Sequence, residues 1–558
     1  MTDYDAIVVG TGMSGGWAMR VLCEAGLKTL ALDRGRMVEH ATDYITEHKQ
    51  PWEMPWRGGR VHPDDVKDYP VQSRHFVFNE YTRHWLIRDA DSPYVEEKPF
   101  DWIQPDVVGG KALIWGRQSY RWSDMDFAAN LEDGHGEDWP IRYDDLAPWY
   151  DLVEKTIGVS GSADGLPQLP DGIFQKPMEM NAAEKRARTA IEQAFPERRV
   201  IIGRTAVLTE ALGDRAACHY CGPCARGCST GSYYSTQSSA LPAARKTGNL
   251  TLLPRQLVHS VLYKDGRATG VRVIDMESGD EVDYTARVVF MCASAPGTVR
   301  ILLNSKSEAF PDGIANSSGT LGHYLLNHQA RVGARGRLSG LRDRYYQGNR
   351  PNGLYVPRFR NLDAKTRQDK FVRGYGMQGQ ARREGWVRGE SAPGFGASFK
   401  ESLRDPGDWT MGLQAYGEVL PYYDNYMTLD DTLTDKWGMP AIRFHVGRFD
   451  NELAMRQDMA ATAGEMLEAA GATEVETYDN PAIAPGNTNH EMGGARMGRD
   501  PGTSVLNKWN QCHDVPNLFV TDGACMASSA NQNPSLTYMA LTARAAHYAV
   551  DQLKTSSL

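Results

Sequence analysis

Four of the eight cysteines lie close together, at a spacing typical of the ligands of a metal cluster. They are Cys218, Cys221, Cys224 and Cys228, in the pattern C-x2-C-x2-C-x3-C. Bacterial ferredoxins use this ligand run, although Ser229 here replaces the usual final proline. Four thiolates in one short segment can converge on an inorganic core without closing a long loop. The spacing therefore predicts an iron–sulfur cluster within residues 215–232.

Three other uses of this cysteine run stay open. Zinc held by four thiolates usually takes two C-x2-C pairs with a longer loop between them. Disulfides would form if the protein is exported. Buried free thiols are the third alternative, and the Gly and Arg neighbours disfavour it because they are typical of a loop. The other cysteines are expected to be buried as small apolar side chains, and they are Cys23, Cys292, Cys512 and Cys525.

A glycine-rich turn near the start of the chain predicts a dinucleotide site. Gly10-Thr11-Gly12-Met13-Ser14-Gly15 follows an apolar strand at Ala6–Val9 and precedes a helix predicted at Gly16–Ala25. Such glycines permit a tight turn and let the backbone approach a pyrophosphate, which then faces the N-terminus of the helix. Gly10, Gly12 and Gly15 are therefore candidate cofactor-binding residues.

An acidic residue completes this βαβ unit. Asp33 ends the next strand, Leu27–Leu32, 23 residues after Gly10. This is close to the ~20 residues expected for the acid that binds a ribose. A glycine turn in an unrelated α/β protein is the alternative, and the motif alone does not distinguish FAD from NAD.

The rest of the chain predicts further strands and helices. Two strand-like runs surround the turn Lys264-Asp265-Gly266, and a buried strand at Val288–Met291 precedes a helix from Gly297. Residues 320–450 alternate short β-like runs with turns. Long helices are expected at Asn451–Ala470 and Thr537–Leu553, a last strand at Leu518–Val520, and an irregular covering region from about 40 to 100.

Four separated segments resemble the glucose–methanol–choline (GMC) oxidoreductase family, in matching order and over essentially the whole chain. The first is the N-terminal unit, and the second is Val108–Gly116 followed by Arg121 and Asp126. The third is Asn489-His490-Glu491-Met492-Gly493-Gly494 with Met497-Gly498, and the fourth is Asn517–Gly523 leading into Asn533-Pro534. The resemblance implies an α/β fold, α+β overall, in which a Rossmann-like FAD-binding domain is joined to a substrate domain built on an antiparallel sheet.

The resemblance also implies domain boundaries. The FAD-binding domain is predicted at residues 1–45, 100–130, 205–312 and 484–558, with the cysteine loop at 215–232. The substrate or cap domain is predicted at residues 46–99, 131–204 and 313–483.

The family motifs assign roles to particular residues. His490 matches a histidine that faces the flavin as general base, and Asn533 matches its partner before the final proline. Further contacts with the flavin are implied for Gly109, Gly110, Asp522 and Gly523. Some relatives attach flavin covalently through a histidine just before the Trp of the second segment, where this chain has Ile114. The resemblance therefore implies non-covalent FAD.

The cysteine run narrows the resemblance to a subgroup of bacterial FAD/iron–sulfur sugar dehydrogenases, and within it to glucoside 3-dehydrogenase catalytic subunits. The subgroup's cluster can be of the three-iron kind, in the pattern C-x5-C-x3-C, which Cys218, Cys224 and Cys228 fit. Cys221 would then be spare, or would complete a four-iron cluster.

The expected function is oxidation of a sugar hydroxyl at C3 by hydride transfer to FAD, with electrons passing through the cluster to an external acceptor such as a cytochrome c. One alternative is an FAD sugar or alcohol oxidase, or a dehydrogenase for C1, C2 or C5, with structural cysteines. Another is a non-catalytic flavoprotein that serves in electron transfer.

Composition limits the partners. The net charge of −9 and pI of about 5.9 argue against a nucleic-acid partner, which would need a basic patch. No stretch reaches the ~18 apolar residues of a membrane span. The N-terminus lacks the features of a secretory signal. We expect a periplasmic protein that is exported together with a small subunit that carries the signal. The alternatives are that the signal has already been removed from this chain, or that the protein stays in the cytoplasm.

Overall fold

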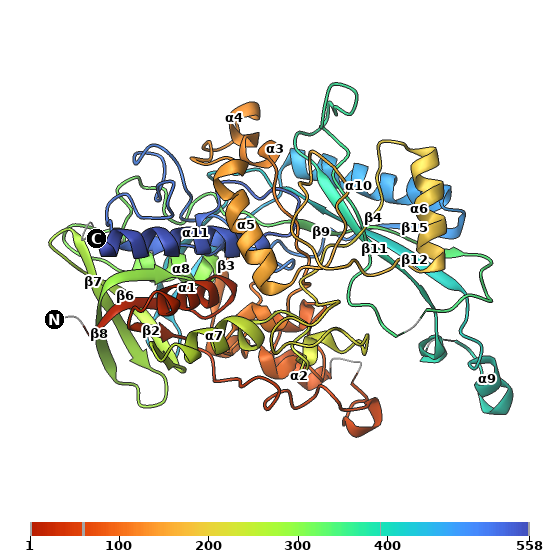
Figure 1. The fold of residues 1–558 in the computed structure, drawn as a ribbon, viewed down its shortest axis with the longest axis horizontal. Coiled ribbons are helices and arrows are strands. Elements are labelled where there is room, and N and C mark those ends of the chain that lie inside the picture. Colours follow the sequence, from red (N-terminus) through yellow and green to blue (C-terminus); the bar gives the residue numbers. More distant parts are fainter. Residues whose placement is uncertain (1–2, 59–61, 347, 391, 556–557) are drawn as a thin grey trace.

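Two large β-sheets organise the chain, one toward each end of its long axis (Figure 1). The computed structural model describes residues 3–58, 62–346, 348–390, 392–555 and 558. Met1 and Thr2, with which the first predicted segment begins, lie outside the described residues. The sheets differ in kind, because the first is mainly parallel and the second is antiparallel.

The first sheet has the topology of a dinucleotide-binding domain. Its strands run in the order β5 (Leu250–Leu253), β2 (Thr29–Leu32), β1 (Tyr4–Val9), β8 (Glu281–Met291), β7 (Arg267–Asp275) and β6 (Gln256–Lys264), and β16 (Leu518–Val520) pairs with β8. Strands β5, β2, β1 and β16 run parallel to one another and to the inner half of β8, whereas β6 and β7 form an antiparallel extension. The central strands are apolar and fully buried, as parallel strands covered on both faces must be.

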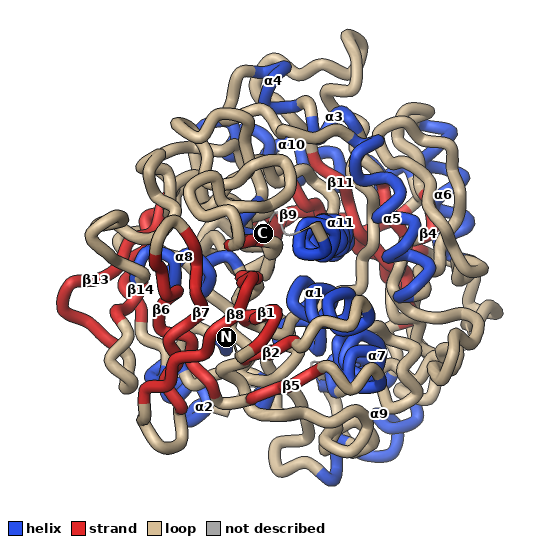
Figure 2. Tube along the Cα trace, turned by 60° about the vertical axis from the view of Figure 1, so that its left-hand side comes forward, coloured by secondary structure: helices blue, strands red, loops and turns tan. Residues whose placement is uncertain are grey.

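Helices cover this sheet on two sides (Figure 2). On one side lie α1 (Met13–Glu24), α7 (Leu241–Lys246) and α11 (Ser535–Lys554), with α5 (Tyr143–Ile157) packed on α11; on the other lies α8 (Ala295–Asn304). The apolar side chains of α5 belong to the core of the first sheet, although residues 131–204 were assigned to the cap domain. The predicted domain boundaries as a whole stay a prediction.

The second sheet is the antiparallel platform expected of a substrate domain. Its order is β15 (Ala472–Asp479), β9 (Gln329–Leu338), β12 (Trp409–Gly417), β11 (Tyr375–Arg383), β10 (Leu354–Val356) and β4 (Ile201–Ile202). Helices α10 (Asp450–Ala469) and α6 (Ala182–Ala194) pack against it. Along β12 the apolar residues alternate with polar ones, so that Met411 and Leu413 enter the core while Gln414 and Tyr416 face the opposite side. The α/β fold class with a second antiparallel domain is therefore confirmed.

Smaller elements join the two halves. A third sheet of β13 (Tyr426–Thr434), β14 (Pro440–His445) and β3 (Tyr94–Glu96) packs into the first core. The remaining helices are α2 (Pro63–Asp68), α3 (Asp124–Phe127), α4 (Ala129–Asp133) and α9 (Gly396–Ser402). The described residues between 40 and 100 form mostly turns, bends and 3-10 segments, as expected.

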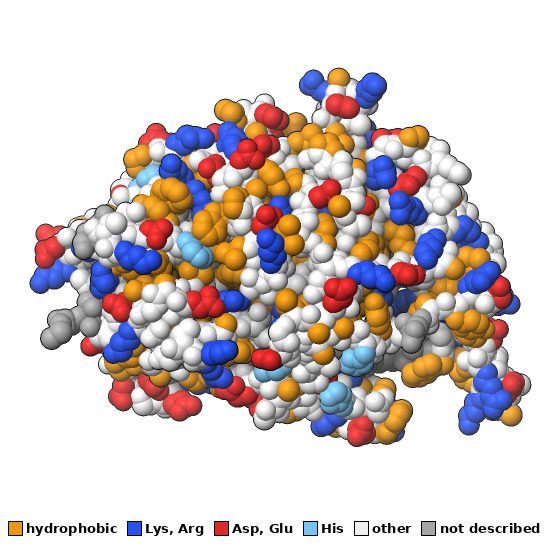
Figure 3. Space-filling view, in the orientation of Figure 1, with side chains coloured by type: hydrophobic (Ala, Val, Ile, Leu, Met, Phe, Trp, Pro, Cys, Tyr) orange, Lys and Arg blue, Asp and Glu red, His pale blue; other side chains and the backbone are white. Residues whose placement is uncertain are grey.

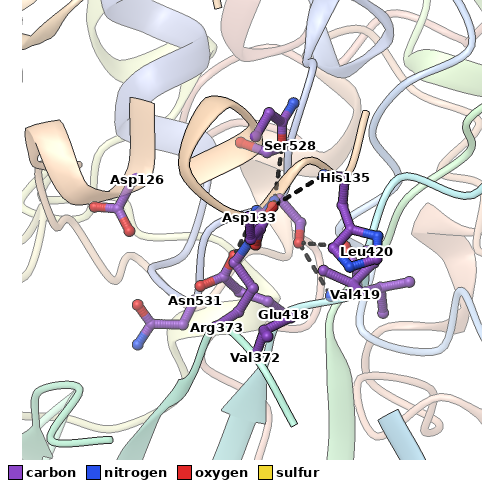
Figure 4. Close-up of polar contacts among 12 residues, drawn as sticks. Asp126, Asp133, His135, Val372, Arg373, Glu418, Val419, Leu420, Ser528 and Asn531 are labelled. Carbon is purple, nitrogen blue, oxygen red and sulfur yellow. Dashed lines mark hydrogen bonds and ion pairs between the residues drawn. The ribbon is translucent and has the colours of Figure 1, made fainter. Parts of the chain in front are cut away.

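A buried ionic cluster connects helix α4 with the chain next to strands β11 and β12 of the second sheet (Figure 4). Arg373 pairs with Asp133, donates to Asn130 Oδ1 at 2.9 Å, and lies 3.4 Å from a carboxylate oxygen of Glu418. Arg373 and Glu418 are each almost fully buried. Separating the partners of such a cluster would leave a buried charge uncompensated. These contacts therefore fix the position of α4 against the second sheet.

The predicted elements are present, with shifted ends. Helix α1 starts at Met13 rather than Gly16, because Gly12 serves as its N-cap and the helix begins inside the glycine motif. Strand β8 starts at Glu281 rather than Val288, since its outer half pairs with β7. On the face drawn in Figure 3, basic and acidic side chains are interspersed. Among the described residues, no helix is long and apolar enough to cross a bilayer.

Candidate active site

A cavity of about 520 Å³ joins the first sheet to the exposed face of the second. It begins where the parallel strands end, which is where open α/β sheets bind their ligands, and it continues to the side chains of β11 and β12. Eight of the predicted site residues line it, and they are Gly10, Gly12, Asp33, Gly110, His490, Asp522, Gly523 and Asn533. Gly15 and Gly109 lie behind this lining.

The glycines of the first turn have two different tasks. A Cβ on Gly15 would lie 1.8 Å from the carbonyl oxygen of Gly10, and a Cβ on Gly10 would lie 2.4 Å from that of Cys292. These two positions allow α1 to pack closely on the strands. A Cβ on Gly12 would meet only the Gly109 carbonyl oxygen, at 3.9 Å. Gly12 therefore presents open backbone to the cavity at the N-terminus of α1, which suits a pyrophosphate.

Asp33 lies at the nucleotide end of the cavity. Its carboxylate accepts from the backbone N–H of Thr11 at 3.0 Å and from that of Gly35 at 2.7 Å, and burial raises its pKa. A carboxylate has about four acceptor sites, so capacity for a ribose hydroxyl remains. Arg34 and Gln104 line the same cavity, and Arg34 Nε, Arg34 Nη2 and Gln104 Nε2 are buried with no hydrogen-bond partner among the described residues.

Further unpaired polar atoms line the cavity. Within the described chain, Thr488 Oγ1, Asn489 Oδ1 and Glu491 Oε1 are buried without a hydrogen-bond partner, while the other carboxylate oxygen of Glu491 pairs with Lys111. Asp522 accepts from Thr298 Oγ1 at 2.6 Å, and burial raises its pKa to about 6. Because buried polar groups in native proteins are nearly always paired, unpaired donors and acceptors along one cavity fit an elongated polar ligand such as FAD.

His490 and Asn533 meet at the end of the cavity that the second sheet lines. His490 Nε2 lies 3.2 Å from Asn533 Nδ2, and Gln378 Nε2 donates to Asn533 Oδ1 at 2.6 Å. The other ring nitrogen, His490 Nδ1, lies 2.9 Å from His328 Nδ1. Burial lowers the pKa of His490 well below 6.5, and His328, Lys111 and His75 lower it further. The imidazole is therefore neutral at physiological pH and can accept a proton.

The second sheet supplies site residues that sequence patterns missed. The cavity is lined by His328 from the segment before β9, by Gln378 from β11, and by Gln414 and Tyr416 from β12. The alternation of polar and apolar residues around Tyr416 could have indicated a polar sheet face that includes Gln414. His328 stands in no such pattern, so there was no reason to select it from the sequence. The turn after β8, with Ala293 and Ser294, also lines the cavity. The rule that ligands bind at the carboxyl ends of parallel strands could have found it.

The cysteine run lies in a loop at the surface. Cys221 is exposed, whereas Cys218, Cys224 and Cys228 are half-buried. Burial and the charges of the neighbouring thiols raise the pKa of Cys218 to about 11, so the thiols lie near one another. Within the described residues, however, no three or more His, Cys, Asp or Glu side chains are grouped as a metal ion would require. The thiols fit a cluster in kind and number, but they are not arranged as a set of ligands.

Neighbouring segments hold this loop against the cavity. Trp85 Nε1 donates to the carbonyl oxygen of Ala225 at 3.1 Å, and the backbone N–H of Ser229 donates to Glu47 Oε1 at 2.8 Å. Ala225 lines the same cavity as His490, and Cys221 lines a separate surface hollow of about 1180 Å³. The loop thus extends from the cavity to the surface. The other four cysteines are buried, as predicted.

The cavity has a glycine turn suited to a phosphate at one end and a neutral histidine at the other, and it lies on a parallel sheet. This combination is typical of a dinucleotide-dependent oxidoreductase. Family models described as GMC oxidoreductase match residues 4–330 and 421–542. The chain belongs to the GMC oxidoreductase family, whose members bind FAD and oxidise CH–OH groups.

Several proteins are similar to the chain over much or all of its length. A 2-methyl-1,2-propanediol dehydrogenase from Mycolicibacterium austroafricanum is 31% identical, over 98% of this chain and 94% of its own length. The fructose dehydrogenase large subunit from Gluconobacter japonicus is 25% identical, over 99% of this chain and 98% of its own. A C-glycoside 3-oxidase from Arthrobacter globiformis is 28% identical over 56% of each chain.

Proposed function

We propose that the protein is an FAD-dependent dehydrogenase that oxidises a hydroxyl of a sugar or glycoside, with C3 of glucose, glucosides and disaccharides as the preferred position. The continuous cavity from the Gly12 cradle to His490 and Asn533 carries this proposal. Two of the similar proteins are named for action on a sugar or a C-glycoside, and the third is named for a small diol.

The wall opposite the nucleotide cradle favours a polyhydroxylated substrate. Amide side chains line it, and they are Gln118, Asn352, Gln378 and Gln414. An amide both donates and accepts hydrogen bonds, as a hydroxyl does. A wall of amides can therefore satisfy several hydroxyls of a neutral sugar at once, which an apolar wall suited to a simple alcohol could not.

The reaction requires that the substrate hydroxyl lose its proton as its carbon loses a hydride. His490 Nε2 accepts the hydroxyl proton, and Asn533 Nδ2 donates a hydrogen bond to the same oxygen. Gln378 keeps that amide in place through Asn533 Oδ1. FAD, when bound, supplies the hydride acceptor. General-base assistance of this kind is typically worth ~10²–10⁴-fold.

FAD is proposed to bind non-covalently. Ile114, at the position of the linking histidine in some relatives, lines the cavity and offers no nucleophile. Acid precipitation should release the yellow colour into the supernatant. Flavin that stays with the precipitated protein would contradict the proposal.

The cysteine run is proposed to hold an iron–sulfur cluster, either a three-iron cluster on Cys218, Cys224 and Cys228 or a four-iron cluster that also uses Cys221. Its ferredoxin-like spacing and the contact of Ala225 with the flavin cavity support this. The cluster, when bound, supplies one-electron transfer. Anaerobically purified protein should contain iron and acid-labile sulfide, whereas stoichiometric zinc without sulfide would contradict the proposal.

We also propose that the protein is periplasmic and works with two partners. One is a small subunit that carries the export signal, and the other is a cytochrome c-type electron acceptor. One similar protein is named a large subunit, which supports a multi-subunit assembly. Fractionation of native cells should find the chain in the periplasmic extract together with a smaller protein. Recovery of the chain alone, from the cytoplasm, would contradict this part.

Anaerobic turnover tests the activity itself. Glucose, a methyl glucoside and 2-methyl-1,2-propanediol should each be offered with an artificial electron acceptor, and NMR of the products identifies the oxidised carbon. We expect the 3-keto sugar. Oxidation of the diol alone would overturn the substrate class, and rapid peroxide formation in air would favour an oxidase.

A further inference from the structure

We infer that His328, a histidine outside every recognised motif, positions the proposed base by fixing which nitrogen of His490 carries the proton. This inference rests on the proposed role of His490 as general base. His328 directly precedes β9 of the second sheet and is almost fully buried. Its two ring nitrogens face Ser529 and His490.

The carbonyl oxygen of Ser529 determines the protonation of His328. That oxygen lies 3.0 Å from His328 Nε2 and can only accept, so Nε2 must carry the proton. Burial lowers the pKa of His328 to about 4, so the ring is neutral and Nδ1 keeps its lone pair. His328 therefore donates to Ser529 and accepts at Nδ1.

The protonation of His490 then follows from His328. His490 Nδ1 lies 2.9 Å from His328 Nδ1, which keeps its lone pair, so His490 must donate there. A neutral imidazole has one N–H, which leaves His490 Nε2 as the acceptor facing Asn533. With the opposite tautomer, the nitrogen at the reacting hydroxyl would already be protonated and could accept nothing.

A second chain of hydrogen bonds, which reaches His490 through Asn533, also requires that His490 Nε2 be unprotonated. Tyr120 donates to Gln118, Gln118 donates to Gln378, and Gln378 donates to the oxygen of Asn533. The amide of Asn533 must then turn its NH₂ group toward His490 Nε2. Both chains begin away from His490 and agree on an unprotonated Nε2.

The backbone that anchors His328 is itself held firmly. Ser529 is fully buried, and its hydroxyl exchanges hydrogen bonds of 3.2 Å with the backbone N–H and carbonyl oxygen of Val419. The tautomer of His490 therefore depends on the docking of the second half of the molecule onto the first.

The test compares three variants by anaerobic stopped-flow reduction of bound flavin. His328→Leu removes the acceptor, and flavin reduction should slow about 10- to 100-fold, as when other orienting partners are lost, with little change in the apparent Kd of the sugar. His328→Asn can place an oxygen near the former Nδ1 and should recover much of the rate. His513→Leu, which removes a half-buried histidine outside the cavity, is the control and should behave like wild type.

An independent readout is the tautomer itself. In ¹⁵N-histidine spectra of the FAD-loaded protein, the His490 signals are those lost in His490→Gln. They should show a protonated Nδ1 in wild type and a shift of the proton toward Nε2 in His328→Leu. A His490 that carries its proton on Nε2 in wild type, or a His328→Leu variant that reduces flavin within about twofold of wild type, overturns the inference. If His490→Gln also reduces its flavin at the wild-type rate, the proposed base itself has failed.

Discussion

The His490–Asn533 site and the cysteine loop differ in how fully the fold arranges their functional groups. The hydrogen bonds that reach the two ring nitrogens of His490, through His328 and Asn533, have a defined direction, and the groups that anchor them are buried. Around the cysteines, the thiols share a surface loop, Cys221 is exposed, and no ligand set is assembled within the described chain. A proton-accepting site can be completed by the protein alone, whereas a cluster site is completed by the inorganic core that its thiolates bind.

The sharpest test of this comparison is His490→Ala. Loss of the proposed base should slow flavin reduction by sugar about 10²- to 10⁴-fold, the usual worth of a general base. FAD should stay bound, because the Gly12 cradle lies at the far end of the cavity. Anaerobic stopped-flow at saturating sugar measures the rate, and flavin absorbance measures the FAD content. A rate within a few-fold of wild type would place the base elsewhere.

The pH dependence of flavin reduction should follow the protonation of His490. A histidine accepts a proton only when neutral, so the rate should rise with pH and then level off. Because burial, together with Lys111 and two neighbouring histidines, lowers the pKa of His490 well below 6.5, the midpoint of the rise should lie below 6.5. The rate should therefore be at its plateau at pH 7 and fall as the pH drops through that lowered pKa. A midpoint at or above 6.5 would show that His490 is not shielded in this way.

Asn533→Ala should have a smaller effect than loss of the base. The variant removes one hydrogen bond to the substrate oxygen and leaves His490 in place, so we expect a loss of about 10-fold, the worth of roughly one kcal/mol or somewhat more. Asn533→Asp is a useful companion, because it keeps the size but places a carboxylate oxygen opposite His490 Nε2. A loss in Asn533→Ala as large as in His490→Ala would mean that Asn533 does more than position the oxygen.

Cys224→Ser should have the smallest effect on flavin reduction. The residue lies outside the lining of the cavity, although its neighbour Ala225 belongs to it. Reduction of flavin by sugar should stay within a few-fold of wild type, while transfer to an external acceptor should slow strongly and iron content should fall. Cys525→Ser, at a buried cysteine outside the run, serves as the control and should keep its iron. Equal transfer rates in both variants would count against an electron relay through the loop.

Short-range patterns in the chain were sufficient to select Gly10, Gly12 and Asp33, which line one cavity in the structure. Gly10, Gly12 and Gly15 could be selected because the local backbone turn requires glycine. Asp33 could be selected because it directly follows a predicted strand, and in the structure its carboxylate accepts from Thr11 of the turn. His490 and Asn533 were assigned by resemblance, and the structure brings them within 3.2 Å although 43 residues separate them. The positions of predicted helices were correct to within a few residues, because their apolar faces repeat at helical spacing.

The residues that orient the site could not be found in this way. His328, Gln378 and Gln414 lie on three different segments of the second sheet, and none has a motif around it. Their roles depend on which face of an antiparallel sheet they occupy and on how that sheet docks against the first. A one-residue change of register in β11 or β12 would turn Gln378 or Gln414 into the core.

Residue types at short or fixed spacing were enough to identify the family. They also predict a phosphate-binding turn at Gly10–Gly15 and a catalytic pair, His490 and Asn533. The fold was needed to show that one cavity joins this turn to the pair, and in which direction the hydrogen bonds reach His490 through His328. Hydrogen-bond direction depends on which atoms face each other across two separately formed sheets, and no local pattern in the chain records that.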